Sequence, residues 1–397
     1  MLLTAYYLIK PVREALILTG GGAEIKSYAA AGQGLLLLGA VPLYAWLAGR
    51  LPRRQLIAGV TLFFAACLGG FYLLARMEVP LGVVFYLWVG IFNLMVISQF
   101  WSFANDLYTP EQGKRLFPIV AFGASAGAVL GSYVAQLLIG PLGVYQLMLV
   151  AGGLLVLSLG LTLGVEGRMQ PAAAGAAPPP GRAGAFALVF ANRYLLLIAL
   201  LMLVLNWVNT TGEYLLGRLV SGEAAEAVAR GAALSEKEYI GKFYAQFFMG
   251  VNLAGLLLQL FVVSRIIDRL GLRPGLLFLP AIALAGYGLL AALPLLAVVR
   301  WAKTAENAVD YSLQNTVRQA LFLPTTRKEK YQAKQAIDTF FVRTGDLLSA
   351  GLVFAGVNWL NFGTGHFALV NLGLAAVWLG LALAVGRENQ RRMAEAG

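Results

Sequence analysis

Two groups of charged residues lie inside hydrophobic segments of this chain. Lys10, Arg13 and Glu14 interrupt the first segment at helical spacings that place them on one face. A much later segment holds a second group with the same periodicity: Lys303, Glu306, Asn307 and Asp310. A charge at the centre of a membrane helix costs roughly 2.5–3.5 kcal/mol, so it is kept mainly where it lines a polar cavity or meets a partner. The chemistry that these side chains offer is the binding of a charged solute.

Each group also has a purely structural interpretation. Arg13 and Glu14 could form a self-neutralising patch that only fixes helix packing, and Pro11 between Lys10 and Arg13 favours a local break in the helix. The later group could be a salt-bridge ladder that locks its helix to the first one. Lys10 lies outside the local pairing of Arg13 with Glu14, and a cation that faces a cavity suits an anionic ligand such as a phosphate or a carboxylate.

The elements that hold these residues are membrane helices. Apolar residues make up 59% of the chain and charged residues 12%, and the mean hydropathy is +0.74. Apolar stretches of about 20 residues, enough to cross a bilayer, recur along the whole length. We expect about twelve transmembrane helices: 1–18, 28–49, 55–76, 81–106, 117–138, 142–165, 187–217, 239–264, 275–293, 295–322, 333–357 and 366–386.

Glycines and single residues add detail to this picture. The face with Gly123, Gly127 and Gly131 is predicted to allow close helix approach. The chain has one cysteine and one histidine, so we predict no metal site and no cofactor. Lys10 and Glu14 interrupt the apolar region that a signal peptide would need, so the first span is interpreted as retained. It begins at Met1 without a leader, which leaves open a native start further upstream.

The net charge of +11 is unevenly distributed along the chain. Basic residues concentrate in every second loop, such as those at 50–54, 114–115, 265–273 and 387–392, whereas the opposite loops hold few, among them Lys26. By the positive-inside rule both termini face the cytoplasm. This pattern predicts a multi-pass protein of the cell inner (cytoplasmic) membrane, with the lipid bilayer as its partner and no nucleic acid.

A linker and a weak internal repeat divide the chain. Residues 167–184 are rich in Ala, Pro and Gly and cannot build a packed core. AGRLPRRQ at 48–55 corresponds to DRLGLRPG at 268–275, and LYTPEQGKR at 107–115 corresponds to FLPTTRKEK at 322–330. Coincident offsets of this kind predict an all-α, Major Facilitator-type fold with a central cavity between two six-helix bundles. The predicted domains are 1–165, a linker at 166–186, and 187–397.

The remaining candidate residues lie on other helices and in the loops. Arg343 and Asp346 stand three residues apart in the eleventh predicted helix, and Asn105 ends the fourth. Together with the two charged groups they form the predicted substrate-binding set. The basic loops supply the residues predicted to gate transport: Arg50, Asp106, Lys114, Arg115, Asp268 and Arg269.

Three stretches resemble the ATP:ADP translocase family of nucleotide transporters: IKPVREALILTGGGAE at 9–24, QFWSFANDLYTPEQGKRLFPIVAFGASAG at 99–127, and the region 311–351 with YSLQNTVRQALFLP and EKYQAKQAIDTFFVRTGDLLSAG. By this match Arg13 and Glu14 take the places of a family lysine and aspartate. The resemblance implies a divergent bacterial member that works by antiport of nucleotides.

The chain departs from the family at two positions. Family members that exchange ATP for ADP usually carry a glutamate before Leu-Trp-Gly-Ser, whereas this chain has no acid between Glu78 and Asp106. They also tend to have a lysine where this chain has Asp346, a reversal that would repel phosphate. The fold and transporter class therefore follow from the resemblance, and ATP and ADP as cargo do not.

These observations predict a secondary active transporter that moves a charged solute by alternating access. A nucleotide or another phosphorylated metabolite, exchanged by ATP:ADP-type antiport, is the leading cargo. Two alternatives stay open: proton-coupled transport of a non-nucleotide solute, and a non-transporting membrane scaffold. No nucleophile–base pair or nucleotide-hydrolysis motif is present, so an enzyme is not expected. We expect a monomer.

Overall fold

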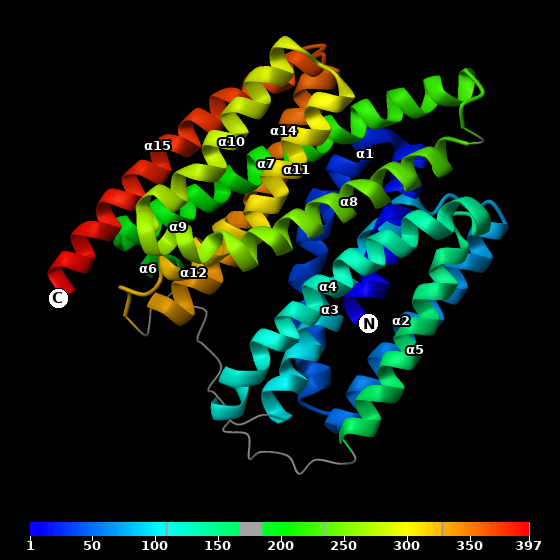
Figure 1. Ribbon diagram of the computed structural model, residues 1–397, viewed down its shortest axis with the longest axis horizontal. Helices are drawn as coiled ribbons and strands as arrows, with labels where there is room; N and C mark the ends of the chain where they lie inside the picture. The colour runs from blue at the N-terminus through cyan, green and yellow to red at the C-terminus, as the bar shows by residue number, and fades with distance from the viewer. Residues whose placement is uncertain (108–109, 167–184, 234, 327–328, 397) are drawn as a thin grey trace. The chain divides into compact units, whose positions relative to one another are not determined.

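The computed structural model of the protein describes residues 1–107, 110–166, 185–233, 235–326 and 329–396. These residues form helices and short connections, with no strand among them (Figure 1). In lipid, a helix satisfies its own backbone donors and acceptors, which explains why the apolar segments adopt this structure. The predicted all-α membrane fold is confirmed.

Contacts divide the chain into two units. Unit 1 comprises Met1–Ala177 and Val220–Leu253, and unit 2 comprises Pro178–Leu219 and Ala254–Gly397. The predicted domain boundaries stay a prediction, because the linker residues 167–184 lie outside the described part of the chain.

Unit 1 is built around its first helix, which packs against α3, α4 and α5. Its helices are α1 (Leu2–Ala48), α2 (Arg53–Arg76), α3 (Gly82–Leu107), α4 (Pro110–Leu142) and α5 (Gln146–Glu166), with the end of α7 (Arg193–Ala229) and the start of α8 (Glu236–Phe261). Glycine permits a close approach of α4 to α1. A Cβ at Gly131 of α4 would lie 2.5 Å from the Thr4 carbonyl oxygen of α1. The predicted close approach is confirmed at Gly131 and Gly127, whereas nothing lies within 4 Å of a Cβ at Gly123.

The first helix breaks at Gly22 and not at Pro11. Gly22 has φ 74° and ψ −176°, in the left-handed region that favours glycine. The backbone remains helical through Pro11, so the predicted local break there is wrong. Proline fixes φ near the helical value, and the bilayer supplies no alternative partner for neighbouring backbone groups.

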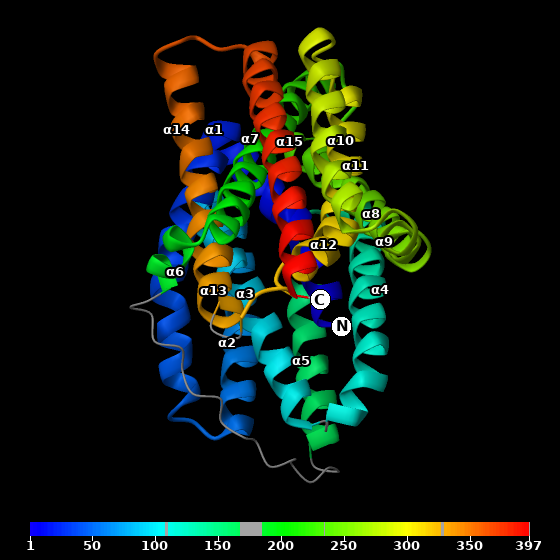
Figure 2. The same cartoon turned by 90° about the vertical axis from the view of Figure 1, so that its left-hand side faces the viewer.

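In unit 2, α10 packs against both α15 and α11 (Figures 1 and 2). Besides its parts of α7 and α8, the unit contains α6 (Ala185–Ala191), α9 (Val263–Leu270), α10 (Leu272–Ala292), α11 (Leu296–Val309), η2 (Asp310–Gln314), α12 (Asn315–Ala320), η3 (Glu329–Ala333), α13 (Lys334–Ala336), η4 (Ile337–Phe341), α14 (Val342–Asn358) and α15 (Thr364–Ala396). The elements η2, η3 and η4 are single π-helical turns.

Ten helices of the described residues are long and apolar enough to cross a membrane, whereas the sequence predicts twelve spans. The difference has two causes. The predicted spans 1–18 and 28–49 are joined in α1, on either side of Gly22. The predicted span 295–322 is divided into α11, η2 and α12, each of which is too short to span by itself.

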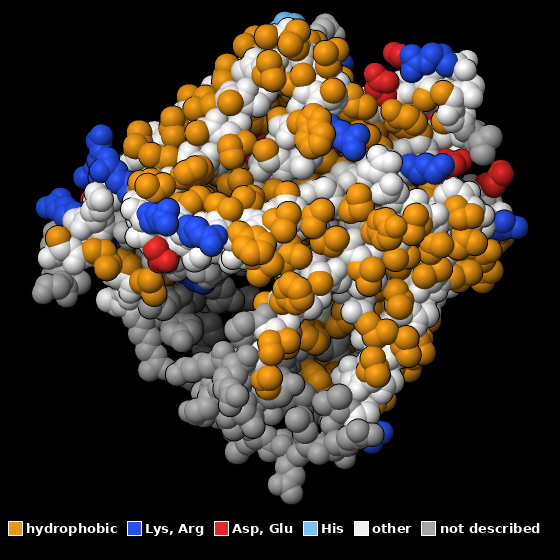
Figure 3. All heavy atoms as spheres, in the orientation of Figure 1, with side chains coloured by type: hydrophobic (Ala, Val, Ile, Leu, Met, Phe, Trp, Pro, Cys, Tyr) orange, Lys and Arg blue, Asp and Glu red, His pale blue; other side chains and the backbone are white. Residues whose placement is uncertain are grey.

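The surface of unit 2 is that of a membrane protein. In Figure 3, hydrophobic side chains cover α10 and α15, and exposed Leu289, Leu369 and Val377 belong to these helices. Charged side chains gather near α9, where Arg265, Asp268 and Arg269 are exposed. Apolar belts bounded by charged ends are typical of helices that lie in a bilayer.

Candidate functional site

In unit 1, two cations surround the buried carboxylate of Glu14. Glu14 Oε2 lies 2.7 Å from Lys26 Nζ, and Oε1 accepts a hydrogen bond from Arg13 Nε at 2.9 Å. The Arg13 guanidinium also lies 4.7 Å from the centre of the Tyr86 ring. The Glu14 side chain is 1% exposed, so its charge depends on these partners. The predicted pairing of Arg13 with Glu14 is formed, with Lys26 as an additional member.

Lys10 lies one helical turn before Glu14 and is buried among aromatic rings. Its ammonium nitrogen is 4.0 Å from the ring centre of Phe248 and 5.0 Å from that of Tyr7. Cation–π contacts of this kind stabilise a desolvated ammonium group. In this unit α1 thus carries two basic side chains on the buried Glu14 carboxylate and a third, Lys10, one turn away among aromatic rings.

In unit 2, Lys303 is fully buried and contacts two carboxylates. Its Nζ lies 3.2 Å from Glu306 Oε1 and 3.6 Å from Glu213 Oε1. It also donates a hydrogen bond of 2.6 Å to Asn209 Oδ1. Asn307 Nδ2 donates to Glu213 Oε1 at 3.2 Å. The helical stripe predicted for Lys303, Glu306 and Asn307 is present, and its described partners extend to α7.

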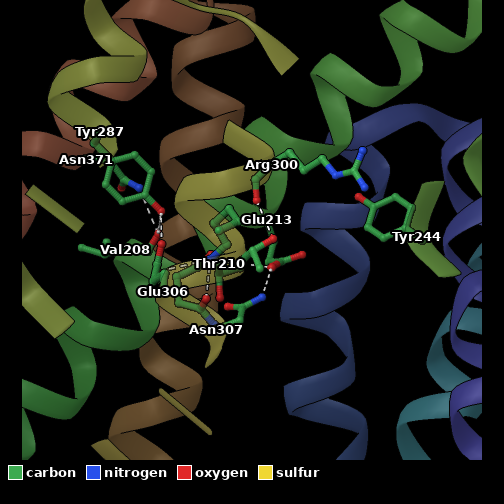
Figure 4. Close-up of polar contacts among 12 residues, drawn as sticks. Val208, Thr210, Glu213, Tyr244, Tyr287, Arg300, Glu306, Asn307 and Asn371 are labelled. Carbon is green, nitrogen blue, oxygen red and sulfur yellow. Dashed lines mark hydrogen bonds and ion pairs between the residues drawn. The ribbon is translucent and has the colours of Figure 1, made fainter. Parts of the chain in front are cut away.

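A tyrosine and an asparagine complete this cluster (Figure 4). The Tyr287 hydroxyl donates to Glu306 Oε2 at 2.9 Å, and Asn371 Nδ2 donates to the Val208 carbonyl at 2.9 Å. Gly212 makes room for the tyrosine, because a Cβ there would overlap the Tyr287 hydroxyl oxygen. The cluster therefore joins α7, α10, α11 and α15 through polar contacts inside the unit.

Asp346 forms a second polar cluster in unit 2. Its Oδ1 accepts hydrogen bonds from Asn206 Nδ2 at 2.7 Å and Thr210 Oγ1 at 2.8 Å, and its Oδ2 lies 3.1 Å from Arg343 Nη1. Gly345 allows this contact, because its Cβ position is 2.7 Å from the Leu203 carbonyl oxygen of α7. The predicted pairing of Arg343 with Asp346 is formed.

The other predicted site residues have different surroundings. Asp310 is the first residue of η2 and lines a cavity. Arg50 is exposed, with its guanidinium 4.1 Å from the Trp46 ring centre, and Asp268 and Arg269 are exposed on α9. Four further side chains lie outside the described part of the chain, so their predicted roles stay predictions: Asn105, Asp106, Lys114 and Arg115.

Lys26 and Tyr287 are among the site residues that the predicted substrate-binding set does not contain, as are the polar residues of α7 and Asn371. Lys26 was predicted in an outer loop, but the structure buries it against Glu14 because α1 resumes directly after Gly22. Lys26 and Glu14 are twelve positions apart and lie on opposite sides of the break at Gly22, so the spacing rules of a continuous helix do not predict that they pair. Tyr287 carries no charge, and its contact with Glu306 depends on the packing of α10 against α11.

No family model and no curated protein sequence matches this chain. Solved structures do match its fold. A POT family transporter in complex with 5-aminolevulinic acid has a TM-score of 0.65 and 12% identity, covering 98% of this chain and 95% of that chain. A bacterial homologue of the iron transporter ferroportin has a TM-score of 0.64 and 14% identity, covering 97% and 96%. The nucleoside transporter NupG has a TM-score of 0.62 and 12% identity, covering 97% and 98%.

These similarities define the class of fold. At 12% to 14% identity they show that the fold is shared, and this similarity extends over nearly the whole length of each chain. The protein is a multi-pass membrane protein with a Major Facilitator-type fold.

Proposed function

We propose that the protein is a secondary active transporter that moves a charged solute by alternating access. Its leading cargo is a nucleotide or another phosphorylated metabolite, exchanged by antiport. The observation that carries the proposal is the set of three buried or nearly buried cations on α1: Arg13 and Lys26 contact the carboxylate of Glu14, and Lys10 lies one helical turn earlier against aromatic rings. A guanidinium and two ammonium groups suit the binding of phosphate or carboxylate oxygens.

The charge balance of unit 2 supports exchange. Lys303 contacts both Glu213 and Glu306, so these two carboxylates share one ammonium group. Buried ion pairs of this kind can exchange partners when a charged ligand arrives, and a departing ligand then restores the original balance. Antiport keeps the membrane interior near neutrality through the cycle.

Fold similarity and motifs add further support. The matched structures include a nucleoside transporter, a bacterial homologue of an iron transporter and a POT family transporter in complex with 5-aminolevulinic acid. The nucleotide assignment rests on the resemblance of 9–24, 99–127 and 311–351 to the ATP:ADP translocase family. The basic loops favour an inner-membrane location with both termini in the cytoplasm. We propose a monomeric, non-enzymatic carrier.

One observation favours proton coupling as a second candidate. Glu306 is 3% exposed and lies in the same cluster as a second carboxylate, Glu213. Neighbouring acids in a poorly solvated site favour the binding of a proton by one of them. An imposed pH gradient would then drive solute uptake into vesicles that contain no internal substrate.

Counterflow in liposomes tests the main proposal. Purified protein is reconstituted into vesicles loaded with one nucleotide, and uptake of a second, labelled nucleotide is measured across a panel. We expect uptake that requires internal nucleotide, and we expect Lys10→Gln to reduce it at least tenfold while Lys10→Arg retains more. Absence of counterflow across the panel would remove nucleotides as cargo.

A matched control separates transport from general loss of charge. Arg54 is exposed at the start of α2, and Arg54→Gln removes one positive charge as Lys10→Gln does. This variant should exchange nucleotides at the wild-type rate. Equal losses in both variants would contradict a specific role for the α1 cluster.

A further inference from the structure

A π-helical turn interrupts the charged helix of unit 2. The turn η2 runs from Asp310 to Gln314, between α11 and α12. π-Helical turns are rare, widen the helix locally, and occur frequently at functional sites. The turn places two polar side chains, one at each of its ends, beside α7.

These side chains line a cavity of about 380 Å³. Small-molecule sites usually occupy roughly 300–1,000 Å³, so this cavity has room for a small solute. Met202 and Leu205 of α7 supply an apolar wall. The remaining lining residues are polar: Asp310, Tyr311, Gln314, Asn315 and Arg318.

Gln314 is the strongest sign of a ligand in this cavity. The residue is 2% exposed, and neither its Nε2 nor its Oε1 has a hydrogen-bond partner among the described residues. Burying an amide without partners costs free energy, so natural proteins rarely keep one. An amide that lines a cavity with both its donor and its acceptor unused is suited to a ligand that carries an amide of its own.

The charged residues on either side of Gln314 define the two ends of that ligand. Asp310 makes no hydrogen bond or ion pair within the described residues, and Arg318 and Lys303 are near enough to act on its charge. Arg318 donates from Nη2 to Asn315 Oδ1 at 3.3 Å, and its Nε has no described partner. Arg318 follows Asp310 by eight positions, which is at most roughly 12 Å along a helix and less where the π-helical turn widens it. The cavity therefore presents an acid, an amide and a guanidinium in that order.

We infer that this cavity binds a small zwitterion with an amide between its charged ends, as in a short peptide. Asp310 accepts hydrogen bonds from the ligand's ammonium group, and Arg318 donates two hydrogen bonds to its carboxylate. Gln314 donates to the ligand's amide carbonyl and accepts from its N–H. A chain of two or three residues spans roughly 7–11 Å, which matches the separation once the side chains reach inward.

Asp310 belongs to the predicted substrate-binding set, but the proposed nucleotide exchange rests on the α1 cluster and not on this cavity. A nucleotide carries no ammonium group, and the residues that would hold its phosphates lie in the α1 cluster. The zwitterion would be a further cargo or an effector, and its binding needs no nucleotide. Failure of nucleotide counterflow would therefore leave this inference standing.

Calorimetry and thermal shift with dialanine test the inference on the full-length purified protein. We expect dialanine to bind the wild-type protein and raise its melting temperature. N-acetyl-dialanine lacks the ammonium group and dialanine amide lacks the carboxylate, so each should bind roughly ten- to hundredfold more weakly. Gln314→Leu should weaken binding of dialanine by a similar factor.

Gln259→Leu is the matched control. Gln259 is exposed on α8, outside the cavity, and the substitution makes the same chemical change. It should bind dialanine as the wild type does. The inference is overturned if dialanine gives neither heat nor shift with the wild type, if the capped peptides bind equally well, or if Gln314→Leu binds normally. The capped peptides test the wild-type protein directly, so the result does not depend on whether a variant folds.

Discussion

At the scale of single residues, the most constrained group is the Glu14 carboxylate. It is 1% exposed and contacts both Arg13 and Lys26. Its partners lie on the same helix, on either side of Gly22. The stability of this part of the fold requires all three charged side chains, because removal of one leaves another charge buried and uncompensated.

Glu14→Gln should therefore destabilise unit 1 strongly. Breaking a buried ion pair from one side costs roughly 3–5 kcal/mol. The double variant Glu14→Gln with Lys26→Met should recover part of this loss, because it also removes one of the stranded cations. Unfolding of both variants in detergent measures the difference. Equal stability of the single variant and the wild type would show that the carboxylate is not buried as described.

Glu329, the first residue of η3, gives a second residue-scale prediction. Burial alone would raise its pKa, but hydrogen bonds from the Thr326 N–H and hydroxyl and from Asn192, with Arg392 nearby, lower the pKa below its usual 4.5. The Thr326 N–H lies 2.8 Å from Glu329 Oε2, and Asn192 Nδ2 lies 2.5 Å from Oε1. The ionised carboxylate therefore stabilises the folded protein.

A lowered folded pKa gives stability that is present above pH 4.5 and is lost as the pH falls through the folded value. Glu329→Gln should melt at a lower temperature than the wild type near pH 7, and the difference should shrink at pH values below 4.5. Melting curves between pH 7 and pH 3 measure this. Glu236→Gln, at an exposed position on α8, should show no such convergence.

At the scale of elements, two glycines set the geometry that brings charged residues together. Gly345 lets α14 approach the backbone of α7, and Gly22 lets α1 break and resume. A side chain at Gly345 would clash with backbone atoms of α7, and a side chain at Gly22 would be strained by the positive φ. Neither glycine touches the charged residues, but each sets the helix geometry that brings those residues together.

Gly345→Ala should separate α14 from α7 and weaken the hydrogen bonds to Asp346. The added Cβ would lie 2.7 Å from the Leu203 carbonyl oxygen, and overpacking of this kind costs roughly 1–3 kcal/mol. Gly351→Ala on the same helix has nothing within 4 Å and should be neutral or slightly stabilising. Thermal unfolding compares the two. A tolerated Gly345→Ala would contradict the close packing.

Gly22→Ala should strain the break in α1. An alanine at φ 74° costs roughly 1–2 kcal/mol relative to glycine. Gly20→Ala, two residues earlier, has nothing within 4 Å of its Cβ and no positive φ, so it should be tolerated. Because Lys26 follows the break, Gly22→Ala should also reduce nucleotide exchange more than Gly20→Ala does. Equal behaviour of the two variants would contradict the account of the break.

At the scale of the whole molecule, the helical architecture was predictable because long apolar segments have few alternatives in lipid. Local pairs such as Arg343 with Asp346 were also predictable, since three-residue spacing places them on one helix face. Apart from the close approach at Gly127 and Gly131, contacts between side chains of different helices were not predictable. The contact of Tyr287 with Glu306 depends on the rotation of one helix against another. The π-helical turn at Asp310–Gln314 leaves no periodic signal in the sequence.

The central claim is that the buried ions bind a transported, charged solute in addition to stabilising the fold. Charge displacement on a supported membrane that carries the reconstituted protein tests this most directly. Rapid addition of nucleotides or sugar phosphates should produce saturable transient currents in the wild type and in Arg54→Gln, with loss of the currents in Lys10→Gln. Currents that are absent for every anionic solute, or unchanged in Lys10→Gln, would contradict the account.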